Sequence, residues 1–256
     1  MWLTLDIGNS SAKGGLFDGP RLTRTFRLPL TRLDPAEAWD AALRAELGGV
    51  HVERAGIASV VPTVTEMAQR VVAHETGAPV LVVRPSLRLP FTLAYETPHT
   101  LGIDRLAAAA AAWTRFGRDA DGPRSVVALD AGTAVTYDVV DRAGVFLGGP
   151  IGAGPVLIHR CLNTGTAQLP EVPLDIPEEV IGRSTREALQ SGIMYGFLDG
   201  VGGMLGRIRT RLGHRPVVVA TGGWGPCLHE HVAAVDHVAP HLVLEGVRVL
   251  MTLNPA

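Results

Sequence analysis

The stretch Leu3–Phe17, LTLDIGNSSAKGGLF, decides how this chain is expected to fold. An apolar run ends at Asp6, a turn of small polar residues follows, and a second apolar run begins after Lys13. An acidic residue at the carboxyl end of a strand lies where open α/β sheets bind ligands. The pattern returns in SVVALDAGTAVTYDVV, where Asp130 stands 124 residues after Asp6 (130 − 6). This repeat predicts two similar lobes that face each other.

The rest of the chain alternates short apolar runs with helical segments, which indicates an α/β protein. In the first half the expected order is three strands, a helix, a strand, a helix and a strand. A polar segment with glycine and proline, residues 117–124, predicts a first lobe at 1–118 and a second at 124–256. A capping box at Ser184–Glu187 predicts the start of a long helix that reaches about Leu212.

Charge and composition exclude several classes of partner. The net charge is −2, the pI is near 6.5 and the arginines are spread along the chain, so no basic footprint for nucleic acid is present. The alanine-rich stretch at 105–117 is too short to span a membrane. Cys161 and Cys227 lack the spacing of a metal site or a disulfide framework. We therefore expect a cytoplasmic protein without a membrane or nucleic-acid partner.

The turn between Asp6 and Lys13 has the chemistry of a phosphate site. Small residues let backbone N–H groups approach phosphate oxygens, and Asn9, Ser10 and Ser11 add side-chain donors. Lys13 is the one lysine of the chain, beside 22 arginines, and it supplies a compact cation. A carboxylate would repel phosphate, so the useful role of Asp6 is to hold Mg²⁺ directly or through water. The alternative is an ordinary turn between strands.

Two further turns of small residues follow apolar strands. Asp130–Thr133 repeats the chemistry of the first turn and would grip a nucleotide's phosphates from the other lobe. Ala220–Gly223 is either a contact for the nucleoside or only a tight bend.

The segment YETPHTLGIDRLAAAA, from Tyr95 to Ala110, places Gly102, Asp104 and Arg105 where an alanine-rich helix begins. Asp104 is either a helix cap or a general base for a substrate hydroxyl. In the second case Arg105 would bind a substrate anion. The residues alone leave both interpretations open.

Several motifs together resemble one family. In chain order they are D-I-G-N-S-x-x-K, Y-x-T-P-x-x-L-G-x-D-R, D-x-G-T-A, F-L-G-G, T-A-x-L-P and G-R-S-T-x-x-A-L-Q-S-G. This set resembles the type III pantothenate kinases, members of the actin/hexokinase/Hsp70-like ATPase superfamily, from Asp6 to about Gly223. The first motif is shared across the superfamily, whereas L-G-x-D-R with the preceding Tyr and Pro is specific to the family.

The resemblance implies an α/β fold of two duplicated actin-like, ribonuclease H-like lobes. Each would be a mixed five-stranded sheet with flanking helices, with ATP in the cleft between the lobes. It also implies ATP-dependent phosphorylation of pantothenate to 4'-phosphopantothenate, the first step of coenzyme A biosynthesis. The expected assembly is a homodimer with the substrate site near the subunit interface.

The resemblance also implies roles for single residues. Asp104 would be the catalytic base, and Asp130 would bind a monovalent cation, potassium or ammonium. Asp6 would hold Mg²⁺, directly or through water. ATP would contact Asp6, Ile7, Gly8, Asn9, Ser10, Ser11, Ala12, Lys13 and Thr133. Pantothenate would contact Tyr95, Gly102, Ile103, Asp104, Arg105 and Thr185.

Two alternatives accompany this reading. One is another kinase or phosphatase of the superfamily, acting on a sugar, acetate or polyphosphate, against which L-G-x-D-R argues. The other is a non-catalytic regulator, an accessory factor for transcription, which has no need of three acidic groups that are all present here: Asp6, Asp104 and Asp130. Pro150, Ala153 and Ser184 depart from the residues commoner in the family, at none of the matched catalytic positions.

Overall fold

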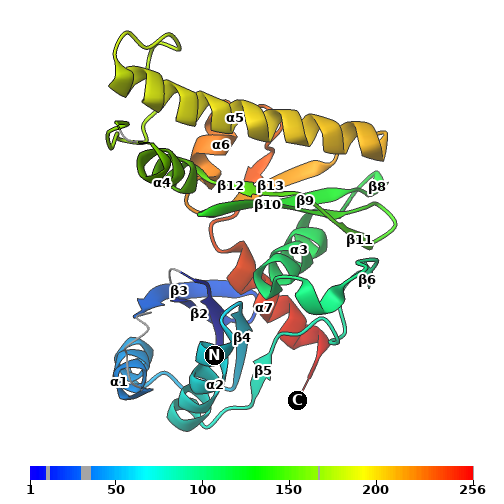
Figure 1. Cartoon of the computed structure of the whole chain (residues 1–256). Helices are drawn as coiled ribbons and strands as arrows, with labels where there is room; N and C mark the ends of the chain where they lie inside the picture. Colours follow the sequence, from blue (N-terminus) through cyan, green and yellow to red (C-terminus); the bar gives the residue numbers. More distant parts are fainter. Residues whose placement is uncertain (10–11, 30–35, 167, 256) are drawn as a thin grey trace.

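The computed structural model describes residues 1–9, 12–29, 36–166 and 168–255. It contains two β-sheets with a pair of helices between them (Figure 1). The first sheet is mixed and has the order β3-β2-β1-β4-β5. Its strands are β1 (Trp2–Ile7), β2 (Ala12–Asp18), β3 (Arg21–Leu28), β4 (Arg54–Ser59) and β5 (Val80–Val82).

Two helices, α1 (Ala36–Leu47) and α2 (Pro62–Thr76), cover the outer face of this sheet. Side chains of alternate β1 residues meet them there in one apolar cluster, which includes Leu3, Leu5, Trp39 and Leu43. The predicted strand and helix order of the first lobe is therefore confirmed. Asp34 and Pro35, the residues expected to start α1, lie outside the described residues.

The second sheet repeats the first. Its order is β14-β13-β9-β10-β11-β6, and β12 pairs with β10. The strands are β9 (Val126–Ala131), β10 (Ala134–Val140), β11 (Val145–Gly148), β12 (Ile151–Ala153), β13 (Val217–Thr221), β14 (His237–Val238) and β6 (Thr92–Leu93). The five strands β11-β10-β9-β13-β14 match β3-β2-β1-β4-β5 in order and in parallel or antiparallel pairing.

The prediction of five strands for this second sheet is wrong by two. The short strand β6 pairs with the open edge of β11, and β12 uses the free backbone groups of β10 beyond the end of β11. Both additions are explained by the need of an edge strand to pair its backbone N–H and C=O groups. Neither β6 nor β12 has a counterpart in the first sheet.

The expected linker at 117–124 folds as a small hairpin of β7 (Arg118–Asp119) and β8 (Gly122–Pro123). The lobe boundaries 1–118 and 124–256 stay a prediction. β6 lies before this hairpin but pairs in the second sheet, and the last helix of the chain packs on the first sheet.

Two helices lie between the sheets: α3 (Ile103–Phe116) and α7 (Leu242–Leu253) (Figure 1). They approach closely because six buried alanines at 107–112 carry the contact face of α3. A Cβ on Gly246 of α7 would collide with the carbonyl oxygen of Ala107. On its other side α7 covers β4, where a Cβ on Gly56 would lie 2.6 Å from the sulfur of Met251. Small residues therefore set the spacing between the two sheets.

The far face of the second sheet carries α4 (Pro155–Gly165), α5 (Thr185–Leu212) and α6 (Gly225–His231). Alternate residues of β9 divide between the faces: Val127 and Leu129 face α5, whereas Val126 and Ala128 face α3. The predicted start of α5 is confirmed, because the Ser184 hydroxyl accepts the Glu187 N–H at 3.2 Å. The Glu187 carboxylate in turn accepts the Arg183 N–H at 2.7 Å.

Two short elements complete the description. A 3₁₀ turn, η1 (Pro98–Thr100), leads into α3. Among the described residues, no helix is both long enough and apolar enough to cross a membrane.

We predict that Gly246→Ala lowers the free energy of unfolding by roughly 2–3 kcal/mol, because the new methyl group forces the α3 backbone away from α7. Gly202→Ala on α5 is the matched control, since its Cβ would meet only Val232 at 3.8 Å. Helix propensity should make this control neutral or stabilising by up to about 1 kcal/mol. Urea unfolding followed by circular dichroism tests the pair, and equal effects at both glycines would contradict the account.

Candidate functional site

Asp6 and Asp130 occupy equivalent places in the two lobes. Asp6 lies on β1 opposite Lys13 of β2, and Asp130 lies on β9 between Thr136 of β10 and Thr221 of β13. The carboxyl ends of both parallel strand pairs point toward the space between the sheets. The sequence prediction that the repeat brings two acidic turns face to face is met by this geometry.

One small cavity, about 20 Å³, is lined from both lobes. Asp6 and Lys13 come from the first sheet, and Asp130 and Thr221 come from the second. Its remaining wall is the turn before α7 and the start of that helix, lined by Pro240, His241, Val243 and Leu244 together with Gly222. Such a volume suits one ion or one to two waters.

A larger cavity of about 400 Å³ adjoins it, and the two share Lys13, Gly222 and His241. Its further lining includes Thr25 and Phe26 of β3 and Gly223. This volume is in the range of sites for small organic ligands. The two cavities together form an ion-sized compartment beside a ligand-sized one.

Gly222 is required where β13 turns toward the cleft. Its φ of +79° is a left-handed conformation that favours glycine, and a Cβ there would strike Oδ1 of Asp130. The Ala220–Gly223 turn thus lies against the Asp130 carboxylate, and its role as a nucleoside contact stays a prediction.

Electrostatics show that four charged side chains act on one another in this cleft. Burial raises the pKa of Asp6 to about 7, and the negative charges of Asp104 and Asp130 raise it as well, while Lys13 opposes them. Burial likewise raises the pKa of Asp130 to about 6, with Asp104 raising and Lys13 lowering it. Three carboxylates thus share one lysine. Such a site favours added cations, and oxygen ligands of this kind are those that Mg²⁺ and other hard cations take.

Asp104 lies in the first turn of α3, where the positive end of the helix dipole favours a carboxylate. The N-cap position itself is occupied by Gly102, so Asp104 acts on the first turn from inside the helix, and its roles as a partner of backbone N–H groups and as a base both stay open. Oδ1 of Asp104 accepts the N–H of Arg105 at 2.8 Å. A Cβ on Gly102 would lie 2.6 Å from that same oxygen, which explains the glycine two residues before the aspartate.

Arg105 is buried in a network that sequence reasoning missed. Its Nε donates to Oδ1 of Asp138 at 2.8 Å, and Nη2 donates to the Gly149 carbonyl at 3.1 Å. Asp138 is fully buried and also accepts the Thr136 hydroxyl at 3.3 Å. Burial raises its pKa to about 6, although Arg105 opposes the shift. The sequence does contain a signal for this network, namely one acidic residue inside the apolar strand VTYDVV. A buried carboxylate needs a cationic partner, so this residue indicates a buried ion pair.

The remaining predicted residues are spread around this cleft. Tyr95 packs its ring edge on Phe146, with 6.1 Å between ring centroids, and lies over Gly148. Thr133 is exposed in the turn before β10. Of the first turn, Ile7 and Ala12 are buried, Gly8 is half-buried and Asn9 is exposed, while Ser10 and Ser11 lie outside the described residues. Ile103 is half-buried beside Asp104.

Thr185 is the predicted site residue that the single chain does not bring to the cleft. It begins α5, which lies on the face of the second sheet opposite α3 (Figure 1). Its side chain is exposed there.

Another group of possible metal ligands lies outside the cleft. Asp40, His74 and Glu75 come close enough to share an ion. Arg44, however, bonds the Asp40 carboxylate at 2.7 Å and that of Glu75 at 2.6 Å. This arginine already bonds both carboxylates and offsets one of their two negative charges, so the cleft is the better candidate for cations.

Solved structures share the fold. A protein from Campylobacter jejuni assigned to the Baf family of transcriptional activators aligns with a TM-score of 0.61 at 20% identity, covering 99% of this chain and 98% of the other. A ROK hexokinase from Thermus thermophilus aligns with a TM-score of 0.50 at 19% identity, covering 97% of each chain. The architecture is thus that of actin-like, hexokinase-type proteins.

Curated relatives match at higher identity over the whole chain. Type III pantothenate kinase of Moorella thermoacetica is 34% identical over 99% of this chain and all of its own length. The enzyme of the same name from Parafrankia sp. is 36% identical over 99% of this chain and 98% of its own. The sequence model of the type III pantothenate kinase family matches residues 2–207. With nearly full-length relatives above 30% identity and a family model that covers most of the chain, this protein belongs to the type III pantothenate kinase family.

Proposed function

We propose that this protein transfers the γ-phosphoryl group of ATP to pantothenate and so forms 4'-phosphopantothenate, the first step of coenzyme A biosynthesis. The observation that carries the proposal is that Asp6, Lys13 and Asp130 line one cavity between the lobes, while the charge of Asp104 acts on both of these aspartates. Full-length membership in the family adds the acceptor, which the cleft alone does not define.

ATP would enter with its phosphates at the paired turns. Lys13 offers a cation to the phosphates, and the Asp6–Lys13 turn offers backbone N–H groups. The adjoining cavity of about 400 Å³, lined by Phe26, Gly222 and Gly223, has room for the nucleoside. Mg²⁺ would be held at Asp6, and when bound it offsets negative charge on the phosphates.

Asp104 would take the proton of the pantothenate hydroxyl. As that oxygen bonds to the γ-phosphorus, the bond from phosphorus to the ADP oxygen breaks, and the proton goes to the Asp104 carboxylate. Phosphoryl transfer needs little covalent help from a protein, so position and charge supply most of the rate. The first turn of α3 provides the charge of Asp104 and also fixes its position, because Oδ1 of Asp104 accepts the Arg105 N–H.

Arg105 would bind the pantothenate carboxylate with the part of its guanidinium that Asp138 and Gly149 leave available. Holding the group from two sides limits its rotation, which keeps the cost of ordering it low when substrate binds. Tyr95, Gly102 and Ile103 would complete the substrate wall beside Asp104.

A monovalent cation, potassium or ammonium, would lie at Asp130. The support is electrostatic: this carboxylate is buried, the charge of Asp104 acts on it, and within the described ranges Lys13 is the one cation that acts on it. Thr133, in the turn after β9, would be the matching contact for ATP.

We further propose a homodimer across α5. Gly192, Gly196, Gly200 and Gly203 form an exposed stripe on this helix, with nothing within 4 Å of a built Cβ. Beside it lies a groove of about 200 Å³ between α5 and β12, where Ile151 is 63% exposed. Thr185 lies on the same helix, so a second copy seated here is the arrangement in which it would approach a substrate. The two free cysteines suit a cytoplasmic protein.

Asp104→Asn tests the base. We expect turnover of pantothenate to fall by about 10²- to 10⁴-fold, because the amide cannot accept the proton, while ATP still binds. A coupled assay for ADP and calorimetric titration of ATP measure the two effects. Asp121→Asn, in the exposed hairpin after α3, is the matched control. Turnover near the wild-type rate would remove Asp104 from this role.

Asp130→Ala tests the monovalent cation. Wild-type activity should rise with potassium or ammonium chloride but not with choline chloride at equal ionic strength. The variant should lose most of its activity and its response to potassium, because the carboxylate that holds the ion is gone. Equal wild-type rates in choline and potassium would show that no such cation is needed.

The raised pKa values predict how stability without cations depends on pH. Folded Asp6 has a pKa of about 7, above its ordinary value of 3.8 in the unfolded chain, so the native state binds more protons between these two pH values. The extra proton bound by native Asp6 stabilises the folded state at low pH. The free energy of unfolding therefore falls as the pH rises through this interval. Relative to wild type, Asp6→Asn should gain roughly 2 kcal/mol between pH 5 and pH 8.

Urea unfolding in EDTA and choline buffer checks this difference, and added Mg²⁺ should reduce it. A difference between the two proteins that is constant across this range would contradict a raised pKa at Asp6.

A further inference from the structure

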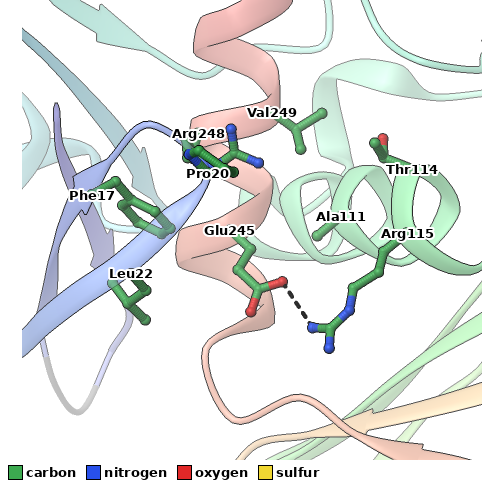
Figure 2. A pocket seen from close by; sticks show the side chains of 9 residues that line it. All are labelled: Phe17, Pro20, Leu22, Ala111, Thr114, Arg115, Glu245, Arg248 and Val249. Atoms are coloured by element: carbon green, nitrogen blue, oxygen red, sulfur yellow. Dashed lines mark hydrogen bonds and ion pairs between the residues drawn. The ribbon is translucent and has the colours of Figure 1, made fainter.

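A further cavity, about 250 Å³, is drawn in Figure 2 and is separate from the two cavities of the cleft. The β2–β3 hairpin, α3 and α7 enclose it, and it shares no lining residue with the cavities at Asp6 and Lys13. The residues that line it include Phe17, Leu22, Thr114, Arg115, Glu245 and Arg248.

Charge in this cavity is not balanced. Arg248 forms no ion pair within the described part of the chain, and its Nε is buried without a hydrogen-bond partner. Its guanidinium carbon lies 5.7 Å from the centroid of the Phe17 ring. Glu245, one turn earlier on α7, is already engaged by Arg115 at 3.3 Å (Figure 2). Two arginines and one carboxylate leave one positive charge without a partner.

These features define the ligand. Polar groups inside proteins almost always have a hydrogen-bond partner, so the guanidinium of Arg248, which has no ion-pair partner among the described residues, favours an acceptor in the cavity that it lines. A guanidinium favours carboxylate or phosphate oxygens, which it can bind through two N–H groups at once. Phe17, Leu22 and Val249 give the cavity an apolar wall, and its volume equals that of about eight water molecules. We propose that this cavity binds a small oxyanion with a short apolar part, either a carboxylate or a phosphate monoester, between Arg248 and Arg115.

The position of the cavity allows a bound anion to affect phosphoryl transfer. Its three walls are the elements that carry catalytic groups: β2 carries Lys13, α3 carries Asp104, and α7 begins at the catalytic cavity. Lys13 is four strand residues from Phe17, about 13 Å, and Asp104 is eleven helical residues from Arg115, about 16 Å. An anion that joins Arg248 to Arg115 ties α7 to α3 beside the hairpin. It therefore alters how the two lobes close around ATP.

Calorimetric titration tests the site with two probes in separate arms, inorganic phosphate and butyrate. Each is added to protein saturated with a non-hydrolysable ATP analogue, Mg²⁺ and pantothenate, which keeps the probe out of the nucleotide site and out of the proposed pantothenate site at Arg105. Arg248→Met keeps the apolar stem and removes the charge. Arg124→Met is the matched control, because Arg124 also has a buried Nε without a partner but lies outside the cavity. Thr114→Glu, at an exposed position of α3, places a carboxylate at the cavity.

We expect saturable binding of at least one probe to wild type and to Arg124→Met, and the probe that saturates identifies the anion as phosphate or carboxylate. Affinity should fall at least about tenfold in Arg248→Met and in Thr114→Glu, the second because its own carboxylate competes. Equal affinity in all four proteins, or no saturation of either probe up to tens of millimolar, would overturn the site. For the coupling, the bound anion should change the KM for ATP or kcat roughly fivefold in wild type and not in Arg248→Met. Identical kinetics with and without the anion would overturn that part.

Discussion

Burial of acidic side chains where the two lobes meet is the constraint on which this structure depends. Asp6 and Asp130 arrive from the two lobes and Asp104 from the helix between them, while Lys13 is the one lysine that acts on them. Taken alone this arrangement is unfavourable: burial is the main cause of the raised pKa values of Asp6 and Asp130, and the neighbouring carboxylates add to it. Cations that accompany a nucleotide turn the same arrangement into a favourable one. The charge distribution thus matches phosphoryl transfer, in which metal ions and fixed dipoles offset the charge of the phosphates.

The fold holds these groups in place through repetition and close packing. In each lobe an aspartate lies near the end of a central strand, and the chain then turns back as a hairpin. The same local structure therefore occurs twice. The lobes are then fixed at a short distance by α3 and α7, whose contact depends on a run of alanines and on Gly246. The same two helices begin beside the cleft at Asp6 and Asp130. They line the cavity of Arg248 further along, α3 near its C-terminal end and α7 from its first turn to its middle. The packing that sets the lobe spacing therefore also provides the place where an anion can influence it.

Local features of this chain could be predicted from sequence, and contacts between distant segments could not. The hairpins at Asp6 and Asp130, the order of strands in the first lobe and the capped start of α5 at Ser184 depend on residues close together in the chain. The pairing of β6 with β11 and the burial of Arg105 against Asp138 depend on tertiary packing. Asp104 shows the limit clearly: the sequence allowed either a cap or a base, and only the backbone shows that Gly102 is the N-cap. For Thr185 the single chain supplies no partner near the cleft.

The central claim is that this cleft phosphorylates pantothenate rather than another acceptor that the fold accommodates. The most direct measurement is ATP consumption by the purified protein in Mg²⁺ and potassium, with the phosphorylated product identified by mass spectrometry. Pantothenate, glucose, N-acetylglucosamine and acetate would be compared at equal concentration, beside a sample without acceptor. We predict that 4'-phosphopantothenate forms in step with ADP, while the other samples stay at the rate without acceptor. Turnover of a sugar or acetate without turnover of pantothenate would contradict the account.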